Sequence, residues 1–280
     1  MTKAVYELKV SKDYHDKTIK ELLTNYGFSA KNQYLVELNN GLFLNKERAT
    51  RFFHLKEGDR LGLDFSSFKR HGIKPYQKPI EIVYEDESVL IVNKGNKTLI
   101  YDDNNDQALI NQVEFYRQSQ GYFYELLPVH RIDKETTGMV VFGKNPLVVS
   151  YLSKRFEEKE VSKIYVALVH HPFNTKDGVI DHPIASDRHN NKERVSHTGK
   201  KATSLYKVIT SSETSRVEIN IIGGRKHQIR VHMAYIGHPV VGDRLYSKDK
   251  EGPMYLHFYK IGFKHPNNLE PIEITCEPGF

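Results

Sequence analysis

The chain has 280 residues, with 41 lysines or arginines against 35 aspartates or glutamates and a formal net charge of +6. This length can bury a core without disulfides. The single cysteine, Cys276, excludes a disulfide framework and a thiolate zinc site. No apolar run approaches the roughly 20 residues that span a bilayer, and residues 1–14 carry charges where a signal peptide is apolar. We therefore expect a cytoplasmic protein outside the membrane.

Residues 1–66 are predicted to form a small N-terminal domain. A helix is expected over 16–26, a second helix after a capping Ser29, and short strands over 42–44 and near 61–63. This order resembles the S4 RNA-binding module, which implies RNA contacts. Lys31 stands nearly alone as a basic residue in the second helix, so a docking role is the alternative. We expect the rest of the chain to stay soluble without this domain.

A basic linker is predicted over residues 67–79, and a larger domain over residues 80–280. Apolar runs predict its first strands over 82–84 and 89–94, and further strands over 139–142 and 163–169. Apolar residues on both faces of the last run indicate a central strand. Helical spacing predicts helices over 106–118 and 147–158.

The run 186–207 contains six lysines or arginines and two acidic residues. A long, basic, hydrophilic loop between strands suits an RNA-facing surface, although a merely solvated loop fits the charge equally well. An alternating strand follows over 216–222. Gly223 and Gly224 then precede a helix whose apolar residues lie at helical spacing, and its N-terminus could hold a phosphate.

Several chemistries do not fit the motifs. Residues 130–133 read His-Arg-Ile-Asp, but a kinase catalytic loop has its aspartate one position earlier and is followed by Asp-Phe-Gly. His227 and His232 are five residues apart, off a common helical face, so a helical metal site is not predicted. A serine nucleophile elbow and a dinucleotide fingerprint are also missing.

Three separated motifs resemble those of the RluA family of RNA pseudouridine synthases. Residues 130–138 read His-Arg-Ile-Asp-Lys-Glu-Thr-Thr-Gly, residues 163–167 read Lys-Ile-Tyr-Val-Ala, and residues 224–232 read Gly-Arg-Lys-His-Gln-Ile-Arg-Val-His. The family's Gly-His-Pro segment follows over 237–243. Residues 93–101 depart from the family's usual Asn-Lys-Pro-x-Gly-Leu pattern, which puts RNA specificity in question more than chemistry. The resemblance covers about residues 80–280.

The resemblance implies an α+β fold: a pseudouridine synthase core with a mixed, largely antiparallel sheet and flanking helices, plus the small S4-like domain. It implies isomerisation of uridine, in which the base leaves C1′ through N1 and returns through C5. Asp133 would be the catalytic carboxylate, as a nucleophile or as a base, with Arg230 as its cationic partner. Tyr165 would stack on the target base and could assist removal of the C5 proton.

The remaining site residues are expected to contact substrate. Arg131 would enter the RNA stack where the uridine leaves, and His130 would contact RNA or orient the loop. The last three expected contacts are Arg225, His227 and Gln228. No cofactor or metal is expected, because the reaction includes no redox or phosphoryl-transfer step. Large-subunit ribosomal RNA is the first expectation for the substrate, with transfer RNA or a non-catalytic RNA-binding or ribosome-assembly role as alternatives, and a monomer is favoured.

Overall fold

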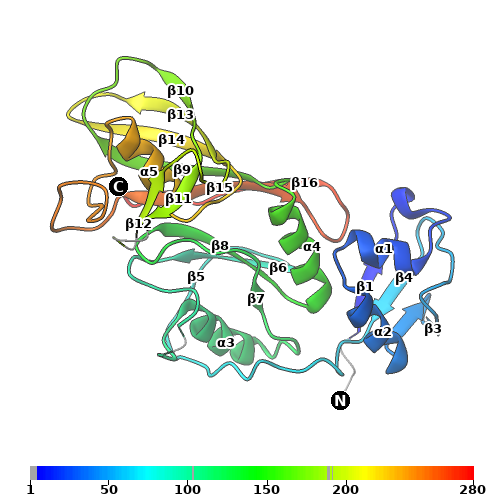
Figure 1. Cartoon of the computed structure of the whole chain (residues 1–280). Helices are drawn as coiled ribbons and strands as arrows, with labels where there is room; N and C mark the ends of the chain where they lie inside the picture. Colours follow the sequence, from blue (N-terminus) through cyan, green and yellow to red (C-terminus); the bar gives the residue numbers. More distant parts are fainter. Residues whose placement is uncertain (1–4, 103, 188–189, 191) are drawn as a thin grey trace.

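A ten-stranded sheet is the framework of the described residues, which in this computed structural model are 5–102, 104–187, 190 and 192–280. Its strands follow the order β10-β13-β14-β9-β15-β8-β6-β5, with β16 beside β15 and β7 beside β8 (Figure 1). β15 and β8 are parallel and the other described pairs are antiparallel, so the prediction of a mixed, largely antiparallel sheet is confirmed. The strands are β5 (Glu81–Glu85), β6 (Val89–Lys94), β7 (Leu127–Pro128), β8 (Thr137–Gly143), β9 (Ser162–His170), β10 (Asp177–Asp181), β13 (Thr203–Thr210), β14 (Thr214–Ile222), β15 (Leu256–Lys264) and β16 (Pro271–Thr275).

A glycine is required where β8 meets β15. Gly138 has a φ of +103°, and a Cβ at this position would lie 2.5 Å from the carbonyl oxygen of Phe258. Side chains other than hydrogen are therefore excluded by both the backbone conformation and the space. This close approach fixes the start of β8, and with it the loop that carries the predicted catalytic aspartate.

Three of the described helices accompany the sheet: α3 (Leu109–Gln120), α4 (Pro146–Glu157) and α5 (Gln228–Tyr235). Asn145 caps α4 by accepting hydrogen bonds from the backbone N–H groups of Leu147 and Val148, at 3.0 Å each, and Pro146 occupies the first turn. The prediction of α4 is confirmed, and α3 begins three residues after the predicted position. None of the described helices is long and apolar enough to cross a membrane.

The basic run 186–207 is not the polar loop that was predicted. Its described residues include the end of β11 (Ile184–Asp187), β12 (Lys192–Val195) and the start of β13. The hairpin of β11 and β12 forms because Ile184 and Val195 pack with Val231 of α5, which gives it a small apolar contact of its own. Residues 188, 189 and 191 of this run lie outside the described residues.

The N-terminal residues form a separate four-stranded sheet in the order β1-β4-β2-β3. Its first helix begins at a capping box, in which Thr18 and Glu21 satisfy each other's backbone N–H groups. Ser29 caps the second helix, as predicted. The elements are β1 (Tyr6–Lys9), a 3-10 helix (Lys12–Tyr14), α1 (Ile19–Asn25), α2 (Ala30–Leu38), β2 (Leu42–Leu44), β3 (Glu47–Arg48) and β4 (Arg60–Leu63).

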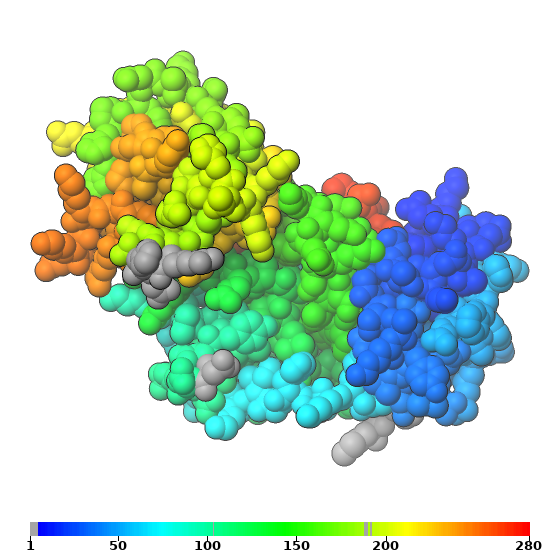
Figure 2. All heavy atoms as spheres, in the orientation of Figure 1, coloured from blue at the N-terminus to red at the C-terminus, as the bar shows by residue number. Residues whose placement is uncertain are grey.

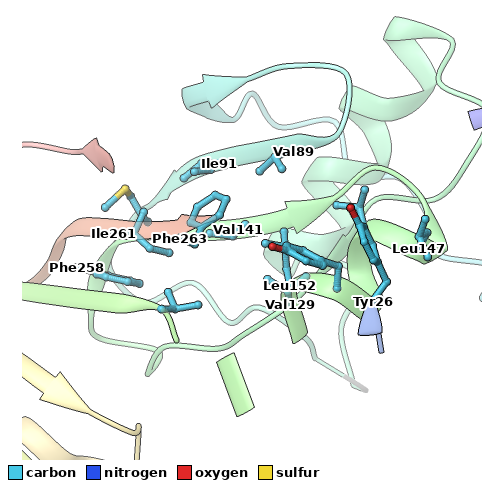
Figure 3. Close-up of a cluster of buried hydrophobic side chains, with 14 of the residues drawn as sticks. Tyr26, Val89, Ile91, Val129, Val141, Leu147, Leu152, Phe258, Ile261 and Phe263 are labelled. Carbon is cyan, nitrogen blue, oxygen red and sulfur yellow. The ribbon is translucent and has the colours of Figure 1, made fainter. Parts of the chain in front are cut away.

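This N-terminal region packs firmly against α4 (Figures 1 and 2). The rings of Tyr26 and Tyr151 lie 4.7 Å apart, and the Tyr26 hydroxyl donates to the carbonyl oxygen of Pro266 at 2.8 Å. Figure 3 shows Tyr26 beside α4 residues in a buried apolar cluster that continues into the main sheet. Removing residues 1–66 would expose this apolar face. The expectation that the remainder stays soluble therefore stays a prediction.

Candidate active site

Asp133 lies in the loop between β7 and β8, on the wall of a cleft of about 780 Å³. The loop turns tightly, since the backbone N–H of Thr136 donates to the carbonyl oxygen of Asp133 at 3.2 Å. Behind it, the buried ammonium group of Lys94 donates to the carbonyl oxygen of Lys134 at 3.0 Å. The Asp133 side chain is 29% exposed. Its carboxylate is therefore held in place and still open to a ligand.

Arg230, on α5, joins two carboxylates. Its Nη1 donates to Oδ2 of Asp133 at 3.2 Å, while Nε and Nη2 donate to the two oxygens of Asp243 at 2.7 and 2.8 Å. Arg230 is 2% exposed and Asp243 is 0% exposed. Burial opposes the positive charge, but the hydrogen bonds and charge of Asp243, with a contribution from Asp133, raise the pKa of Arg230 above its usual value. A permanent cation therefore faces Asp133.

Tyr165, on β9, lines the same cleft. Its ring stacks on Phe258 of β15, with centroids 4.5 Å apart and planes 11° apart. Burial, with the Asp133 carboxylate adding to it, raises the pKa of the Tyr165 hydroxyl well above its usual value. Tyr165 therefore presents a neutral, rigidly supported aromatic group in the same cleft as the Asp133 carboxylate.

Hydrogen bonds of the Gln228 side chain stabilise the start of α5. His227 has a left-handed backbone with φ of +55°, and its Nε2 lies 3.8 Å from Oδ2 of Asp133. The Gln228 side chain accepts a hydrogen bond from the Arg225 N–H at 3.0 Å and donates to the carbonyl oxygen of Thr203 at 2.9 Å. Gln228 lines the cleft, but its amide is engaged in closing the turn.

Basic side chains form the rim of the cleft. Arg131 is exposed there, two residues before Asp133, and Lys134 and Lys226 lie on the same lining. The Arg225 guanidinium donates through Nε to the carbonyl oxygen of Lys201 at 3.2 Å, which leaves its other N–H groups for a ligand. This rim carries the charge clustering that polyanion binding requires.

His130 is not among the residues that line the cleft. Its Nε2 accepts a hydrogen bond from the Val141 N–H at 3.1 Å, and its ring stacks on Phe156 at 4.6 Å. Burial, together with the positive charge of Lys163, lowers the pKa of His130 to about 3. This placement fits a neutral residue that orients the Asp133 loop, rather than one that contacts RNA.

Together, Asp133, Arg230 and Tyr165 place a carboxylate, a fixed cation and an aromatic face around one cleft, the arrangement that the three sequence motifs predicted. Within residues 5–102, 104–187, 190 and 192–280, no group of three or more His, Cys, Asp or Glu side chains is arranged to hold a metal ion.

Comparison with known proteins identifies the family. The sequence model of a family described as RNA pseudouridylate synthase matches residues 88–235. An uncharacterised RNA pseudouridine synthase of Bacillus subtilis, YhcT, is 34% identical over 231 residues, which cover 80% of this chain and 76% of that protein. The chain belongs to the RluA family of RNA pseudouridine synthases. It is therefore an isomerase that acts on RNA.

This synthase is also similar to the ribosomal large subunit pseudouridine synthase D of Borreliella burgdorferi, with 30% identity over 86% of this chain and 78% of that protein. Its fold is that of the human RNA pseudouridylate synthase domain containing 1, with a TM-score of 0.63 and 23% identity over 76% of this chain and 87% of that one. The predicted α+β pseudouridine synthase fold is thereby confirmed.

Two buried residues of the synthase site were not assigned roles from the sequence. Asp243 lies in the Gly-His-Pro segment, but nothing local indicates that it pairs with Arg230. Lys94 is 0% exposed and donates to the carbonyl oxygens of Gly95 and Thr98, at 3.2 and 3.0 Å, as well as to Lys134. Burial lowers the pKa of Lys94 to about 8. The only signal for Lys94 in the sequence was its position between a predicted strand and a loop.

Proposed function

We propose that this synthase isomerises uridine in structured RNA with Asp133 as the catalytic carboxylate. The observation that carries the proposal is the contact of 3.2 Å between the partly exposed Asp133 carboxylate and the buried Arg230 guanidinium, in a cleft of about 780 Å³. Tyr165 provides the surface on which the target base would stack.

The reaction balances without a cofactor. The N1–C1′ bond of uridine breaks, a C5–C1′ bond forms, the C5 proton leaves and N1 gains a proton. Asp133 serves either as the nucleophile at C1′ or as the base that starts glycosidic cleavage. The raised pKa of Tyr165 makes its hydroxyl a poor source of phenolate at neutral pH, which favours a stacking role over proton abstraction.

Release of tritium from RNA labelled at uridine C5 tests this proposal. The wild-type protein should release tritium to water, and Asp133→Asn should release none while keeping its RNA affinity and its fold. Asp177→Asn is a matched control, because Asp177 is an exposed carboxylate on the distant strand β10. RNA binding without release by the wild type would instead support a non-catalytic RNA-binding or assembly factor.

We propose large-subunit ribosomal RNA as the substrate. The name of the Borreliella burgdorferi relative supports this assignment, and the basic rim of Arg131, Lys134, Arg225 and Lys226 suits a folded polyanion. Sequencing cellular RNA for pseudouridine with and without this protein tests it. Loss of a pseudouridine from large-subunit ribosomal RNA is expected, whereas loss confined to transfer RNA would replace this substrate with the alternative one.

We further propose that the N-terminal domain contacts RNA, as the S4 resemblance implies. Tyr34 and Phe52 are 52% and 59% exposed, and the Arg51 guanidinium lies 5.7 Å and 5.3 Å from their ring centroids. Exposed aromatic rings beside arginine are suited to stacking on unpaired bases. These side chains, rather than a row of basic residues on the second helix, would make the contact.

A further inference from the structure

Tyr246 lies beside the Arg230 guanidinium and is not among the residues that line the cleft. Its ring faces Arg230, with the guanidinium carbon 5.2 Å from the ring centroid. Its backbone N–H donates to Oδ1 of Asp243 at 3.3 Å. An aromatic face opposite a buried guanidinium attracts the cation and limits its movement. The ring therefore supports Arg230 through a contact separate from those to Asp133 and Asp243.

The Tyr246 hydroxyl connects two other elements. It accepts a hydrogen bond from the backbone N–H of Glu193 in β12, at 2.8 Å, and lies 3.0 Å from Nδ1 of His227. Because the Glu193 N–H can only donate, the hydroxyl hydrogen is free to point at His227. A neutral His227 then accepts at Nδ1 and carries its proton on Nε2, the nitrogen 3.8 Å from Asp133.

We propose that Tyr246 is a positioning residue of this synthase with two separable roles. Its ring holds Arg230 against Asp133, and its hydroxyl fixes the His227 tautomer that directs an Nε2–H toward the same carboxylate. This inference rests on the proposed catalytic role of Asp133. It also links the β11–β12 hairpin to the reaction centre, through the Glu193 N–H.

The charged groups around His227 make the effect of the Tyr246 hydroxyl on the His227 tautomer measurable. Asp133 faces the ring from the β7–β8 loop, Arg230 and Lys226 from its own segment, and Asp243 and Tyr246 from the following segment. Burial lowers the pKa of His227, so the ring is neutral at pH 7. Without the hydroxyl, a neutral ring can place its proton on Nδ1 and turn a lone pair toward Asp133. Protonation restores the Nε2–H.

Steady-state kinetics of tritium release test both roles with Tyr246→Phe and Tyr246→Leu. Tyr246→Phe should lower kcat about tenfold near pH 8 with little change in KM, since a single hydrogen bond is lost. The deficit relative to wild type should shrink as the pH falls and His227 becomes protonated. Tyr246→Leu should lower kcat by about a further tenfold, because the ring is lost as well.

Tyr206→Phe is the matched control, because it removes a tyrosine hydroxyl on β13 that lies 3.2 Å from the Thr175 hydroxyl and is not part of the cleft lining. Wild-type kcat for Tyr246→Phe at every pH would overturn the hydroxyl role, and equal kcat for the two variants would overturn the ring role. Nitrogen chemical shifts of His227 add a readout independent of catalysis. Tyr246→Phe should lose the Nε2–H tautomer even if the proposed role of Asp133 fails.

Discussion

Asp243 accepts two hydrogen bonds from Arg230, at 2.7 and 2.8 Å, and is completely buried. The bond from Arg230 to the exposed side of the site, at Asp133, is longer, at 3.2 Å. The shorter contacts anchor the guanidinium on Asp243. The same arginine also contacts Asp133, the carboxylate that we propose to be catalytic.

Asp243→Asn should therefore lower both stability and activity. Removing one partner of a buried ion pair costs about 3–5 kcal/mol, and the amide retains one acceptor, so the lower end is expected. The free energy of unfolding in urea measures the effect, and tritium release measures the loss of kcat. Glu273→Gln, which removes the pair between Lys260 and the exposed Glu273 side chain, should cost far less stability than Asp243→Asn. Similar losses for both variants would contradict the anchoring role of Asp243.

Arg131→Ala should leave the fold intact, because Arg131 is exposed on the rim. It should slow modification of a structured RNA about 10- to 100-fold, since extruding a stacked base costs a few kcal/mol. A loosely structured fragment should be slowed much less. Single-turnover rates on the two RNAs make the comparison, and Lys264→Ala, at the far end of β15, controls for loss of charge. Equal slowing on both RNAs would refute base extrusion.

Phe52→Ala should weaken RNA binding about tenfold, since stacking on one base contributes about 1–3 kcal/mol. Stability should hardly change, because the Phe52 side chain is 59% exposed. Affinity is measured by titration with labelled RNA, and stability by thermal unfolding. Ile209→Ala is the control, as Ile209 is also an exposed apolar residue but lies on β13. An unchanged affinity would leave the N-terminal domain with a docking role alone.

His130 should make the fold sensitive to acid. Its folded-state pKa, about 3, lies below the value of about 6.5 in an unfolded chain. The unfolded chain therefore binds more protons between these values, and stability is lost as the pH falls from about 6.5 toward 3, by up to about 1.4 kcal/mol per pH unit. His130→Gln, which retains an acceptor for the Val141 N–H, should show a shallower loss in urea unfolding from pH 4 to 7. Parallel curves for the two proteins would contradict this.

The sequence predicted the main strands, α4, α5 and the three residues that meet in the cleft, because each lies in a local pattern or motif. Its motifs indicated Asp133 as the partner of Arg230, but nothing in them indicated the second pairing with Asp243, which only the folded chain brings about. The orientation of His130 depends on Phe156 and Val141, which only the folded chain brings near it. The β11–β12 hairpin was missed because its few apolar residues are separated by charged ones. The packing of residues 5–66 against α4 depends on complementary surfaces, which the periodicity of apolar residues in the sequence does not indicate.

The firm packing of the N-terminal domain holds that domain at a fixed distance from the loop that carries Asp133. The Tyr6 hydroxyl lies 3.4 Å from the Ser88 hydroxyl, near the last residue of β8. Asp133 lies just before the first residue of β8. The length of β8, roughly 20 Å at 3.3 Å per residue, therefore separates the two regions. An RNA that touches both must present its uridine at a set distance from a second feature. Lengthening or shortening that spacing in the RNA would move the uridine out of register, even with its neighbouring sequence intact.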